Sequence, residues 1–409
     1  MYLRQFALTN FRNYVRLGLN FGPGVTVVCG ENAQGKSNLL EAIHVLATTR
    51  SLRASSDREL IYWRATEGGP LFSRLEGRIG RDGADLHVEM LIKSDTADGN
   101  GNGAGAGPAF AKSIRVNGLP TRAAQLVGQV NVVLFSPEDV ALAGGPPAGR
   151  RRYLDITNSQ VNPSYLRALQ RYNRVLVQRN HLLRQLRERR QPRDRLVPWN
   201  DEQIVHGALV LGQRLRMMAA IAPIVAERFR QLSGTQQTLQ VIYAPTSLPS
   251  GQECNPADAS TITTHVLEAA FRERLAEVAP RELEQAVSLV GPHRDDFAFR
   301  LDGVDLNTYG SRGQQRLAVL ALKLAESEFM QAETGERPIL LLDDVLSELD
   351  PIRRAFVLER TVGEGQTLIT TTDLNEVSPT FLARAEVYRV EAGTVERGRE
   401  NGEAGPADV

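Results

Sequence analysis

The chain has 409 residues, enough for two or three domains with hydrophobic cores, and its 42% hydrophobic and 23% charged content is that of a soluble globular protein. No segment approaches the roughly 18 apolar residues of a membrane span, and the first residues lack a signal-peptide run, so we expect a cytoplasmic protein. Two cysteines, Cys29 and Cys254, supply neither a disulfide framework nor a four-cysteine metal site.

Positive charge is concentrated in one segment, although the formal net charge is zero. Residues 150–200 contain thirteen arginines and only three acidic residues, a local excess of ten. The whole chain has four lysines, so a genomic preference explains part of the arginine content. That preference does not explain why so few acidic residues accompany the arginines, and the segment therefore predicts a basic surface.

The N-terminal part is typical of paired strands that lead into a loop and a helix. Turn residues at 9–10 and 22–24 separate the first predicted strands. A glycine-rich stretch at 95–109 is predicted to be a flexible loop. A helix is predicted to start over 38–46, and the predicted strands cover residues 2–8, 15–21, 25–29, 73–79, 86–92, 113–116 and 131–135.

The segment between the third strand and this helix fits the phosphate-loop pattern, in which glycines let successive backbone N–H groups point at a phosphate. In this pattern Lys36 reaches the β- and γ-phosphates of ATP and Ser37 holds Mg²⁺. The residues predicted to bind the nucleotide are Gly30, Glu31, Asn32, Ala33, Gln34, Gly35, Lys36, Ser37 and Asn38.

The middle of the chain changes to a helical period. Apolar residues step by four and three over 165–186, with Arg179 in the series, and again over 204–232. Two such helices of about 25 to 30 residues predict an antiparallel hairpin roughly 40 Å long. Pro223 is expected to kink the second helix, and a third helix is predicted over 263–278.

The C-terminal part returns to alternating strands and helices. Asp302 and Gly303 form a favoured two-residue turn between two short strands. The predicted strands cover 297–301, 304–306, 339–342, 366–371 and 387–390, the predicted helices cover 315–331 and 351–362, and the tail from Thr394 is predicted to be disordered.

Two motifs in this part carry chemistry. Asp343 and Asp344 follow a buried strand, so the first is placed to act on Mg²⁺, directly or through one of its ligands, and the second to face the γ-phosphate. A solvated pair at the end of a strand is the alternative. The glycine-rich turn at 309–315 precedes a helix and offers N–H groups and the Ser311 hydroxyl to an anion. One subunit does not easily place both this turn and the phosphate loop on one nucleotide. We therefore predict a head-to-tail pair in which Ser311 caps the nucleotide of the other subunit.

Together these motifs resemble the ABC-type ATPase heads of SMC-like DNA repair proteins and, more narrowly, the RecF family of bacterial recombination mediators. The resemblance implies an α/β fold, an ABC-type ATPase head with mixed β-sheets flanked by helices, plus an inserted helical arm. It implies head domains at 1–145 and 287–393, an arm at 146–286 and a tail at 394–409. The segments that carry it are 10–14, 30–38, 135–139, 291–296, 311–316 and 341–350.

The resemblance also implies roles for single residues. Lys36, Asp343 and Asp344 are the expected catalytic group, with Ser37 and Asp343 on Mg²⁺. Asp344 stands where many ABC ATPases have glutamate, so its carboxylate is one methylene shorter and we expect slow hydrolysis. Further nucleotide contacts are implied for Ser311, Gly313, Gln314, Asp350 and Arg12. For Arg12 the alternative is an ordinary surface arginine. The resemblance places the γ-phosphate sensor at Glu138 or Asp139, and the switch residue at Thr372 or Asp373.

The basic segment predicts contacts with DNA phosphates, which are independent of sequence and sensitive to salt. A solvated charged surface is the alternative. The resemblance implies duplex DNA near single-stranded gaps, an ATP-dependent homodimer, weak DNA-dependent ATPase activity, and RecR and RecO as partners in loading RecA. The candidate DNA-binding residues are Arg150, Arg151, Arg152, Arg167, Arg171, Arg174, Arg184 and Arg187.

Other functions fit the sequence less well. A transporter cassette would have its signature turn nearer the phosphate loop, and a GTPase would have a base-reading Asn-Lys-x-Asp motif. A nuclease would need a second metal constellation, and a structural chromosome protein would need a longer arm. His293 with Asp295 and Asp296 could suggest a metal cluster, but a hydrogen-bonded turn is favoured because adjacent side chains on an extended chain point apart.

Overall fold

The computed structural model describes residues 1–66, 71–81, 85–94, 110–188, 192–248, 262–361 and 365–398. The chain forms two compact units: the first contains residues 1–126, 132–137 and the part from 337 onward, and the second contains 127–131 and 138–336. The glycine-rich loop predicted at 95–109 lies outside the described residues. The predicted domain bounds stay a prediction.

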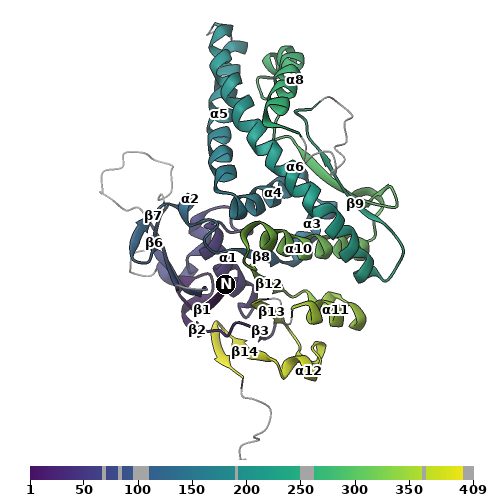
Figure 1. Cartoon of the computed structure of the whole chain (residues 1–409). Helices are drawn as coiled ribbons and strands as arrows, with labels where there is room; N and C mark the ends of the chain where they lie inside the picture. The colour runs from purple at the N-terminus through teal and green to yellow at the C-terminus, as the bar shows by residue number, and fades with distance from the viewer. Residues whose placement is uncertain are drawn as a thin grey trace, which may run out of the picture. The chain divides into compact units, whose positions relative to one another are not determined.

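The first unit contains two six-stranded sheets (Figure 1). One is antiparallel, in the order β2-β1-β4-β5-β6-β7. The buried residues of β4 and β5 alternate, as expected for a sheet with one face in the core. Its strands are β1 (Tyr2–Phe11), β2 (Tyr14–Asn20), β4 (Phe72–Gly80), β5 (Leu86–Ser94), β6 (Phe110–Val116) and β7 (Leu119–Thr121).

The second sheet, in the order β15-β14-β3-β13-β12-β8, is parallel except for its edge strand β15. Its central strands are buried along nearly their whole length, the pattern of a sheet covered on both faces. Its strands are β3 (Val25–Cys29), β8 (Val132–Phe135), β12 (Ile339–Asp343), β13 (Thr367–Thr371), β14 (Ala385–Glu391) and β15 (Thr394–Arg397).

Helix α1 (Lys36–Thr48) contacts strands of both sheets and is buried almost all round, which is the burial of a core helix rather than of a surface helix. Parallel pairing brings the carboxyl ends of β3, β12 and β13 to one edge, with Cys29 opposite Thr371 and Asp343 opposite Thr370. This edge therefore collects the side chains that follow three strands distant in sequence.

The disordered tail was predicted to begin at Thr394, and this is wrong for its first residues. Thr394–Arg397 form β15, which pairs with β14 through a turn in which Ala392 and Gly393 have φ of 46° and 78°. Two consecutive positive φ values suit a tight hairpin turn. The residues beyond 398 lie outside the part of the chain that the structure describes.

The second unit is mainly helical (Figure 1). The predicted arm hairpin is present: α5 (Pro163–Arg187) packs against α6 (Val197–Ser233). α8 (Thr264–Gln285) packs on both of them, and α6 also contacts α10 (Arg312–Thr334). α6 has 37 residues, about 55 Å at 1.5 Å per residue, so it exceeds the predicted length and continues through Pro223.

The remaining elements of this unit complete its core. A three-stranded sheet in the order β11-β10-β9 packs beside α6 and α4 (Pro147–Val161). The predicted hairpin of β10 (Asp296–Leu301) and β11 (Val304–Asp305) is confirmed, whereas β9 (Leu239–Ala244) is an addition to the predicted elements. α3 (Ala141–Gly144) and α9 (Leu306–Tyr309) are short helices beside α10.

The segment 291–296 is the hydrogen-bonded turn favoured from the sequence. His293 Nδ1 lies 2.6 Å from the Tyr172 hydroxyl, and its Nε2 lies 3.1 Å from Ser288 O. The carboxylate of Asp295 is buried and accepts from Tyr243 Oη and the Thr246 backbone N–H. Burial lowers the pKa of His293 to about 4, so this imidazole is neutral at pH 7.

One helical stretch, 194–233, is long and apolar enough to cross a membrane, with a mean hydropathy of 1.4 over its best window. However, 61% of that window is buried inside the protein. Burial among α5, α8 and α10 explains its apolar character, because a helix in the core of a large unit is hydrophobic on several faces.

Candidate nucleotide site

The phosphate loop connects β3 to α1 at the carboxyl edge of the parallel sheet. Two of its glycines stand where a side chain does not fit: a Cβ on Gly30 would lie 2.4 Å from Val390 O, and one on Gly35 would lie 2.5 Å from Asn13 Nδ2. Gly35 also has a φ of 119°, which favours glycine. The N-cap residue of α1 is Gly35, which has no side chain to cap the helix, so the first N–H groups of α1 suit an anion.

Neighbouring segments hold the loop in place. Asn13 Nδ2 donates to Gln34 O at 3.0 Å, and Tyr14 Oη donates to Gly35 O at 2.9 Å. The turn between β14 and β15 adds two bonds, from the backbone N–H of residue 392 to Gln34 Oε1 and from that of residue 393 to Gln34 O. The hairpin missed at 394–397 therefore supports the loop directly.

Lys36 points back into the loop. Its ammonium group donates to the carbonyl oxygens of Gly30 and Glu31, the second at 2.8 Å. Burial lowers the pKa of Lys36, while the carboxylates of Asp344 and Asp343 oppose that shift. The lysine is thus a buried donor at the point where phosphate oxygens meet the loop in proteins of this pattern.

The structure brings the two halves of the predicted site together. Ser37 Oγ donates to Asp343 Oδ1 at 2.8 Å, across 306 residues of sequence. Asp343 is 5% exposed, and the same Oδ1 accepts from Thr370 Oγ1 at 2.8 Å. A hydroxyl and a carboxylate are hard oxygen ligands, so this pair fits a small divalent cation such as Mg²⁺.

Thr370, at the end of β13, was missed by the sequence prediction. Besides binding Asp343, its Oγ1 accepts the Asp344 backbone N–H at 2.9 Å. Asp344 has a φ of 51°, an uncommon conformation for a residue other than glycine. One threonine hydroxyl therefore fixes the backbone of one aspartate and the carboxylate of the other.

Arg12 is fixed by an acid of α1. Its Nε and Nη2 donate to the two carboxylate oxygens of Glu41 at 2.8 and 2.7 Å, and its Nη1 donates to Glu59 O at 2.9 Å. Glu41 is 3% exposed. Arg12 is therefore a held, half-buried residue beside the loop, rather than a free surface arginine.

A cavity of about 600 Å³ lies beside the phosphate loop. Asn38 follows the loop and donates to Asn13 Oδ1 at 2.8 Å, which links the cavity wall to the loop. Trp63 is 68% exposed, and the Arg64 guanidinium lies 4.6 Å from the centre of its ring. The lining residues are Arg12, Asn13, Asn38, Arg58, Glu59, Ile61, Tyr62, Trp63, Leu71 and Phe110.

The glycine-rich signature turn begins α10 in the second unit. Ser311 is the N-cap: its Oγ accepts the Gln314 backbone N–H at 3.2 Å, and its own N–H donates to Gln314 Oε1 at 2.9 Å. This is a capping box. Ser311 and Gly313 are exposed, and a Cβ on Gly313 would meet nothing closer than Ser311 Oγ at 4.0 Å.

Asp350 lies directly before helix α11 (Pro351–Thr361) and caps it. Its Oδ1 accepts the Arg353 backbone N–H at 3.0 Å, and its Oδ2 lies 2.8 Å from Arg353 Nη1. The backbone hydrogen bond is the largest of the effects that lower the pKa of Asp350. The carboxylate remains exposed at the surface of the first unit.

The predicted γ-phosphate sensor and switch residues lie in different surroundings. Glu138 is exposed, whereas Asp139 lies 3.7 Å from the ammonium group of the buried Lys323. Asp373 is exposed and its Oδ1 accepts the Asn375 backbone N–H at 2.9 Å; Thr372 is half-buried. Both role assignments stay predictions.

Comparison with known proteins identifies the family. The model of the RecF/RecN/SMC N-terminal domain matches residues 2–395. The DNA replication and repair proteins RecF of Chloroflexus aggregans and Herpetosiphon aurantiacus are 44% and 41% identical to this chain. These alignments cover 96% and 97% of the chain and 99% of each relative. This chain belongs to the RecF family.

Solved structures agree with this assignment. The structure of the recombination mediator protein RecF with ATP has a TM-score of 0.82 and 31% identity, and covers 97% of this chain and 98% of the other. An Smc head bound to the winged-helix domain of ScpA has a TM-score of 0.53 at 15% identity, with 97% of both chains covered, and supports the fold alone. The fold is therefore the predicted ABC-type ATPase head with mixed sheets and a helical arm.

The arginines predicted to bind DNA fall into different environments in this RecF-family chain. Arg150 is a correction: it is 6% exposed, and its Nε and Nη2 donate to Asp296 at 2.6 and 2.8 Å. Its charge is neutralised inside the second unit, so it does not face a phosphate. Arg151 donates to Asp295 O; the exposed candidates are Arg152, Arg167, Arg171, Arg174, Arg184 and Arg187.

Three of these share one face of α5. Arg167, Arg171 and Arg174 are spaced by four and three residues, which places them within about 60° around a helix of 3.6 residues per turn. Arg184 and Arg187 lie in the last turn, where a basic residue also stabilises the helix dipole. The first three form the stronger candidate surface for a polyanion, and we call them the arm triplet.

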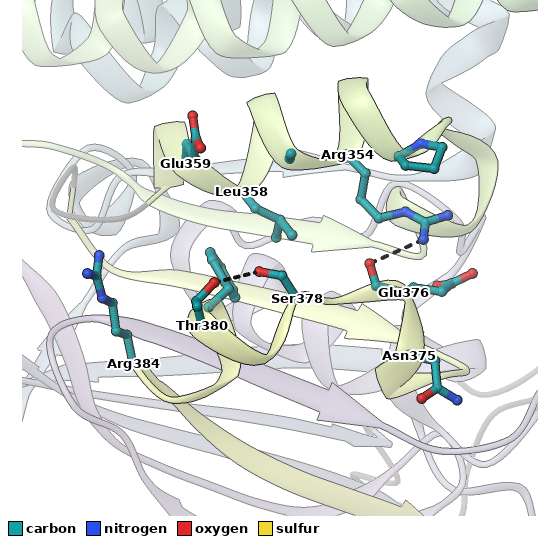
Figure 2. A pocket seen from close by; sticks show the side chains of 11 residues that line it. Arg354, Leu358, Glu359, Asn375, Glu376, Ser378, Thr380 and Arg384 are labelled. Carbon is teal, nitrogen blue, oxygen red and sulfur yellow. Dashed lines mark hydrogen bonds between the residues drawn. The ribbon is translucent and has the colours of Figure 1, made fainter.

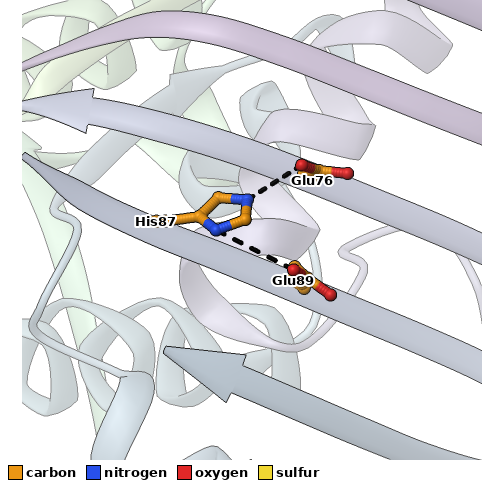
Figure 3. A group of neighbouring side chains, drawn as sticks. All are labelled: Glu76, His87 and Glu89. Atoms are coloured by element: carbon orange, nitrogen blue, oxygen red, sulfur yellow. Dashed lines mark hydrogen bonds and ion pairs between the residues drawn. The ribbon is translucent and has the colours of Figure 1, made fainter. Parts of the chain in front are cut away.

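A second cluster lies on the antiparallel sheet of the first unit. His87 Nε2 lies 2.8 Å from Glu76 Oε1, and Glu89 Oε1 lies 3.8 Å from His87 Nδ1 (Figure 3). Their ligand atoms are close enough for a metal ion. However, Arg74 Nη2 pairs with both carboxylates, at 3.0 and 3.5 Å. Both carboxylates therefore already have a cationic partner in Arg74, and we assign no metal to the cluster.

Proposed function

We propose that the chain is an ATP-dependent DNA-binding recombination mediator. ATP and Mg²⁺ bind at the phosphate loop and join two copies head to tail, the pair holds duplex DNA near a single-stranded gap, and slow hydrolysis releases it. The protein would act in the cytoplasm with RecR and RecO to support RecA loading. The observation that carries the proposal is the Ser37–Asp343 hydrogen bond at the start of α1, next to uncapped N–H groups.

Each group at the carboxyl edge of the parallel sheet has a role in the proposed reaction. The N–H groups of residues 30–37 and the Lys36 ammonium bind the phosphates, and Mg²⁺ is held by Ser37 and Asp343. The ion, when bound, would neutralise charge on the phosphate oxygens. Asp344 orients the attacking water, and Ser311, Gly313, Gln314 and Asp350 of a second copy complete the site.

We further propose that the nucleotide base enters the cavity beside the loop. Asn38 links that cavity to the phosphate loop, and Asn13 bonds to Asn38 and to Gln34 O, so the wall and the loop form one hydrogen-bonded group. Tyr62 and the exposed Trp63 offer aromatic faces for stacking, with ring centres 6.3 Å apart. A purine stacked on a side chain gains about 1–3 kcal/mol.

The base site predicts a fluorescence change. The chain has two tryptophans, so Trp199→Phe leaves Trp63 as the single reporter. Adding ATP with Mg²⁺ is expected to quench its emission and to shift its maximum, because a stacked base replaces water on the ring. Trp63→Ala should weaken ATP binding about 5- to 150-fold, from the stacking energy.

The complementary single-tryptophan protein, Trp63→Phe, is the control for this measurement. Trp199 belongs to the second unit and packs beside an apolar cluster of α5, so its emission should not follow ATP in the monomer. Unchanged Trp63 emission at an ATP concentration that saturates binding by equilibrium dialysis would contradict the base site and leave nucleotide binding intact.

DNA binding tests the proposed function as a whole. With ATP and Mg²⁺, the wild-type chain should prefer gapped duplex over plain duplex in competition, and should lose the preference without nucleotide. Replacing the arm triplet by alanine should weaken binding and reduce the slope of log affinity against log salt by about 3, because each lost phosphate contact contributes about 0.9. Anisotropy titrations of a labelled duplex at several salt concentrations measure both quantities.

A matched triple variant distinguishes the loss of phosphate contacts from the loss of three positive charges in general. Arg230, Arg272 and Arg274 are also arginines of the second unit, but each is paired with an acid, at 2.6 to 2.8 Å. Their replacement by alanine removes the same formal charge and should change the salt slope by less than about 1. Equal slopes for the two triple variants would contradict the assignment of DNA binding to the arm triplet.

A further inference from the structure

Arg354, in the first turn of α11, binds three backbone carbonyls with its guanidinium group. Nε donates to Leu346 O at 3.1 Å, Nη2 to Leu349 O at 3.1 Å, and Nη1 to Glu376 O at 3.2 Å. Figure 2 shows the last bond, which spans from α11 to the segment after β13. One side chain thus joins the loop that follows β12 to the loop that follows β13.

The first loop carries groups of the proposed site, and the second is bonded to the strand that supports them. In the first, Ser347 Oγ donates to Asp344 O at 3.0 Å, which connects the second aspartate to the turn that ends at Asp350. In the second, the Glu376 carboxylate accepts from Thr371 Oγ1 at 2.7 Å. Thr371 follows Thr370, which binds both Asp343 and the Asp344 backbone.

These contacts form a closed ring. It runs from Asp344 through Ser347 to the carbonyls held by Arg354, then to Glu376, and through Thr371 and its neighbour Thr370 back to Asp344. Arg354 is the link in this ring between the two loops.

The three accepting carbonyls lie in or directly after two short 3₁₀ turns, η5 (Leu346–Glu348) and η6 (Leu374–Glu376). Leu346 O also accepts the Leu349 backbone N–H at 3.2 Å, whereas the carbonyls of Leu349 and Glu376 lie at or after the ends of their turns, where the turn supplies no further donor. A guanidinium is a planar fork with five donors, whereas a lysine ammonium is a compact charge on a flexible stem. Only arginine reaches all three acceptors from one position.

We infer that Arg354 is a positioning residue for ATP hydrolysis, which holds Asp344 and the Asp350 turn in one arrangement when two copies share a nucleotide. The inference rests on the proposed function. Arg354 does not touch the phosphate loop: Lys36, Ser37 and Asp343 are held by other residues. Its loss therefore affects the step that needs both loops, and leaves nucleotide binding by one copy intact.

The surroundings of Arg354 make a clean substitution possible. The side chain borders a cavity of about 540 Å³ between α11 and α12 (Pro379–Leu382), also lined by Leu358, Ser378 and Arg384 (Figure 2). Because the guanidinium is half-buried beside open space, Arg354→Met leaves no enclosed void in the core. Arg384 lines the same cavity and is exposed, so Arg384→Met is a matched control.

Four quantities test the inference on the full-length chain: the melting temperature, the ATP dissociation constant by equilibrium dialysis, dimerisation, and the rate constant of ATP hydrolysis with DNA present. Arg354→Met should lower kcat about 10- to 100-fold, the range found when groups that orient a catalytic ligand are lost. Its ATP affinity should stay within about twofold of wild type. Arg354→Lys should behave like Arg354→Met, since its charge alone does not bridge three carbonyls.

Different failures have different meanings. A wild-type kcat in Arg354→Met, with an active wild-type protein, overturns the positioning role alone. A parallel loss of kcat, ATP affinity and melting temperature also overturns it, because that pattern indicates a structural role. Wild-type protein that binds no ATP would overturn the proposed function itself.

A double-mutant cycle tests the ring. Thr371→Val removes the hydroxyl that binds Glu376 with little change in volume. If both residues act through one ring, the double variant with Arg354→Met should have a kcat no more than about twofold below the worse single variant. Effects that multiply fully would show that the two residues act independently, and would contradict the ring.

Discussion

Replacing Lys36 by alanine is expected to abolish ATP-dependent pairing of two copies of this chain. Sedimentation velocity with ATP and Mg²⁺ should show a dimer for wild type and a monomer for the variant at the same concentration. The physical reason is the loss of the buried ammonium donor that binds the loop carbonyls Gly30 O and Glu31 O. Without it, the charge on the phosphates is not neutralised and ATP does not join two subunits.

Lys93→Ala is the matched control for this substitution. Lys93 is one of the four lysines, lies at the end of β5 and is exposed. This variant should pair like wild type. A Lys36→Ala protein that still dimerises with ATP would contradict the proposed role of the phosphate loop in pairing.

A second variant, in the signature turn, should also prevent ATP-dependent dimerisation. Ser311 is exposed at the start of α10, so Ser311→Arg adds a bulky charge without disturbing the core. It should bind ATP as a monomer and fail to pair. Mixing the two inactive proteins should restore part of the pairing and hydrolysis, because one of the two sites in a mixed dimer then has both Lys36 and Ser311. No recovery on mixing would contradict the head-to-tail arrangement.

The sequence predicted those site residues that belong to short contiguous motifs. Ser37 and Asp343 were paired correctly because parallel strands end at one edge of a sheet, so residues that follow two such strands meet. The roles of Thr370 and Arg354 depend on contacts between loops after different strands. A threonine in a buried strand or an arginine in a first helical turn has no local pattern that distinguishes it.

The basic segment shows the limit of counting charges. Arg150 was included with the DNA-binding candidates because few acids lie near it in sequence, but its partner Asp296 follows 146 residues later.

The heptad pattern of the arm predicted only part of its buried surface. The heptad pattern predicted buried positions at steps of four and three, and Tyr165, Tyr172 and Leu186 are buried as expected. Val175 is buried as well, although it lies outside the predicted series, and α5 packs against α8 in addition to α6.

The arginine within the predicted apolar seam has the largest expected effect on stability. Arg179 is 2% exposed and joins three elements, with bonds to Glu282 Oε2 at 2.6 Å, Ser288 Oγ at 2.7 Å and Asn200 Oδ1 at 2.8 Å. Glu282 is fully buried on α8. Arg179→Leu therefore leaves a buried carboxylate without its counter-charge, and should reduce the free energy of unfolding of the second unit by about 3–5 kcal/mol.

Trp199 reports on this unit directly. It packs against an apolar cluster formed by the end of α5 and by Leu196, so urea unfolding of a Trp63→Phe background follows the second unit alone. Arg272→Leu is the control, because its pair with Asp201 is exposed on both sides, at 59% and 51%, and should contribute no more than about 1 kcal/mol. Equal losses for Arg179→Leu and Arg272→Leu would contradict the prediction.

Removing both charges shows whether the pair stabilises the second unit or instead selects how its helices pack. In Arg179→Leu with Glu282→Leu both ions of this pair are gone, and the free energy of unfolding should recover most of the loss, since apolar replacements of a buried pair are often neutral or stabilising. A polar residue in an apolar seam can instead select the register of packed helices. If the double variant is stable but binds DNA less tightly than wild type, Arg179 acts by fixing how α5, α6 and α8 pack, and so where the arm triplet lies.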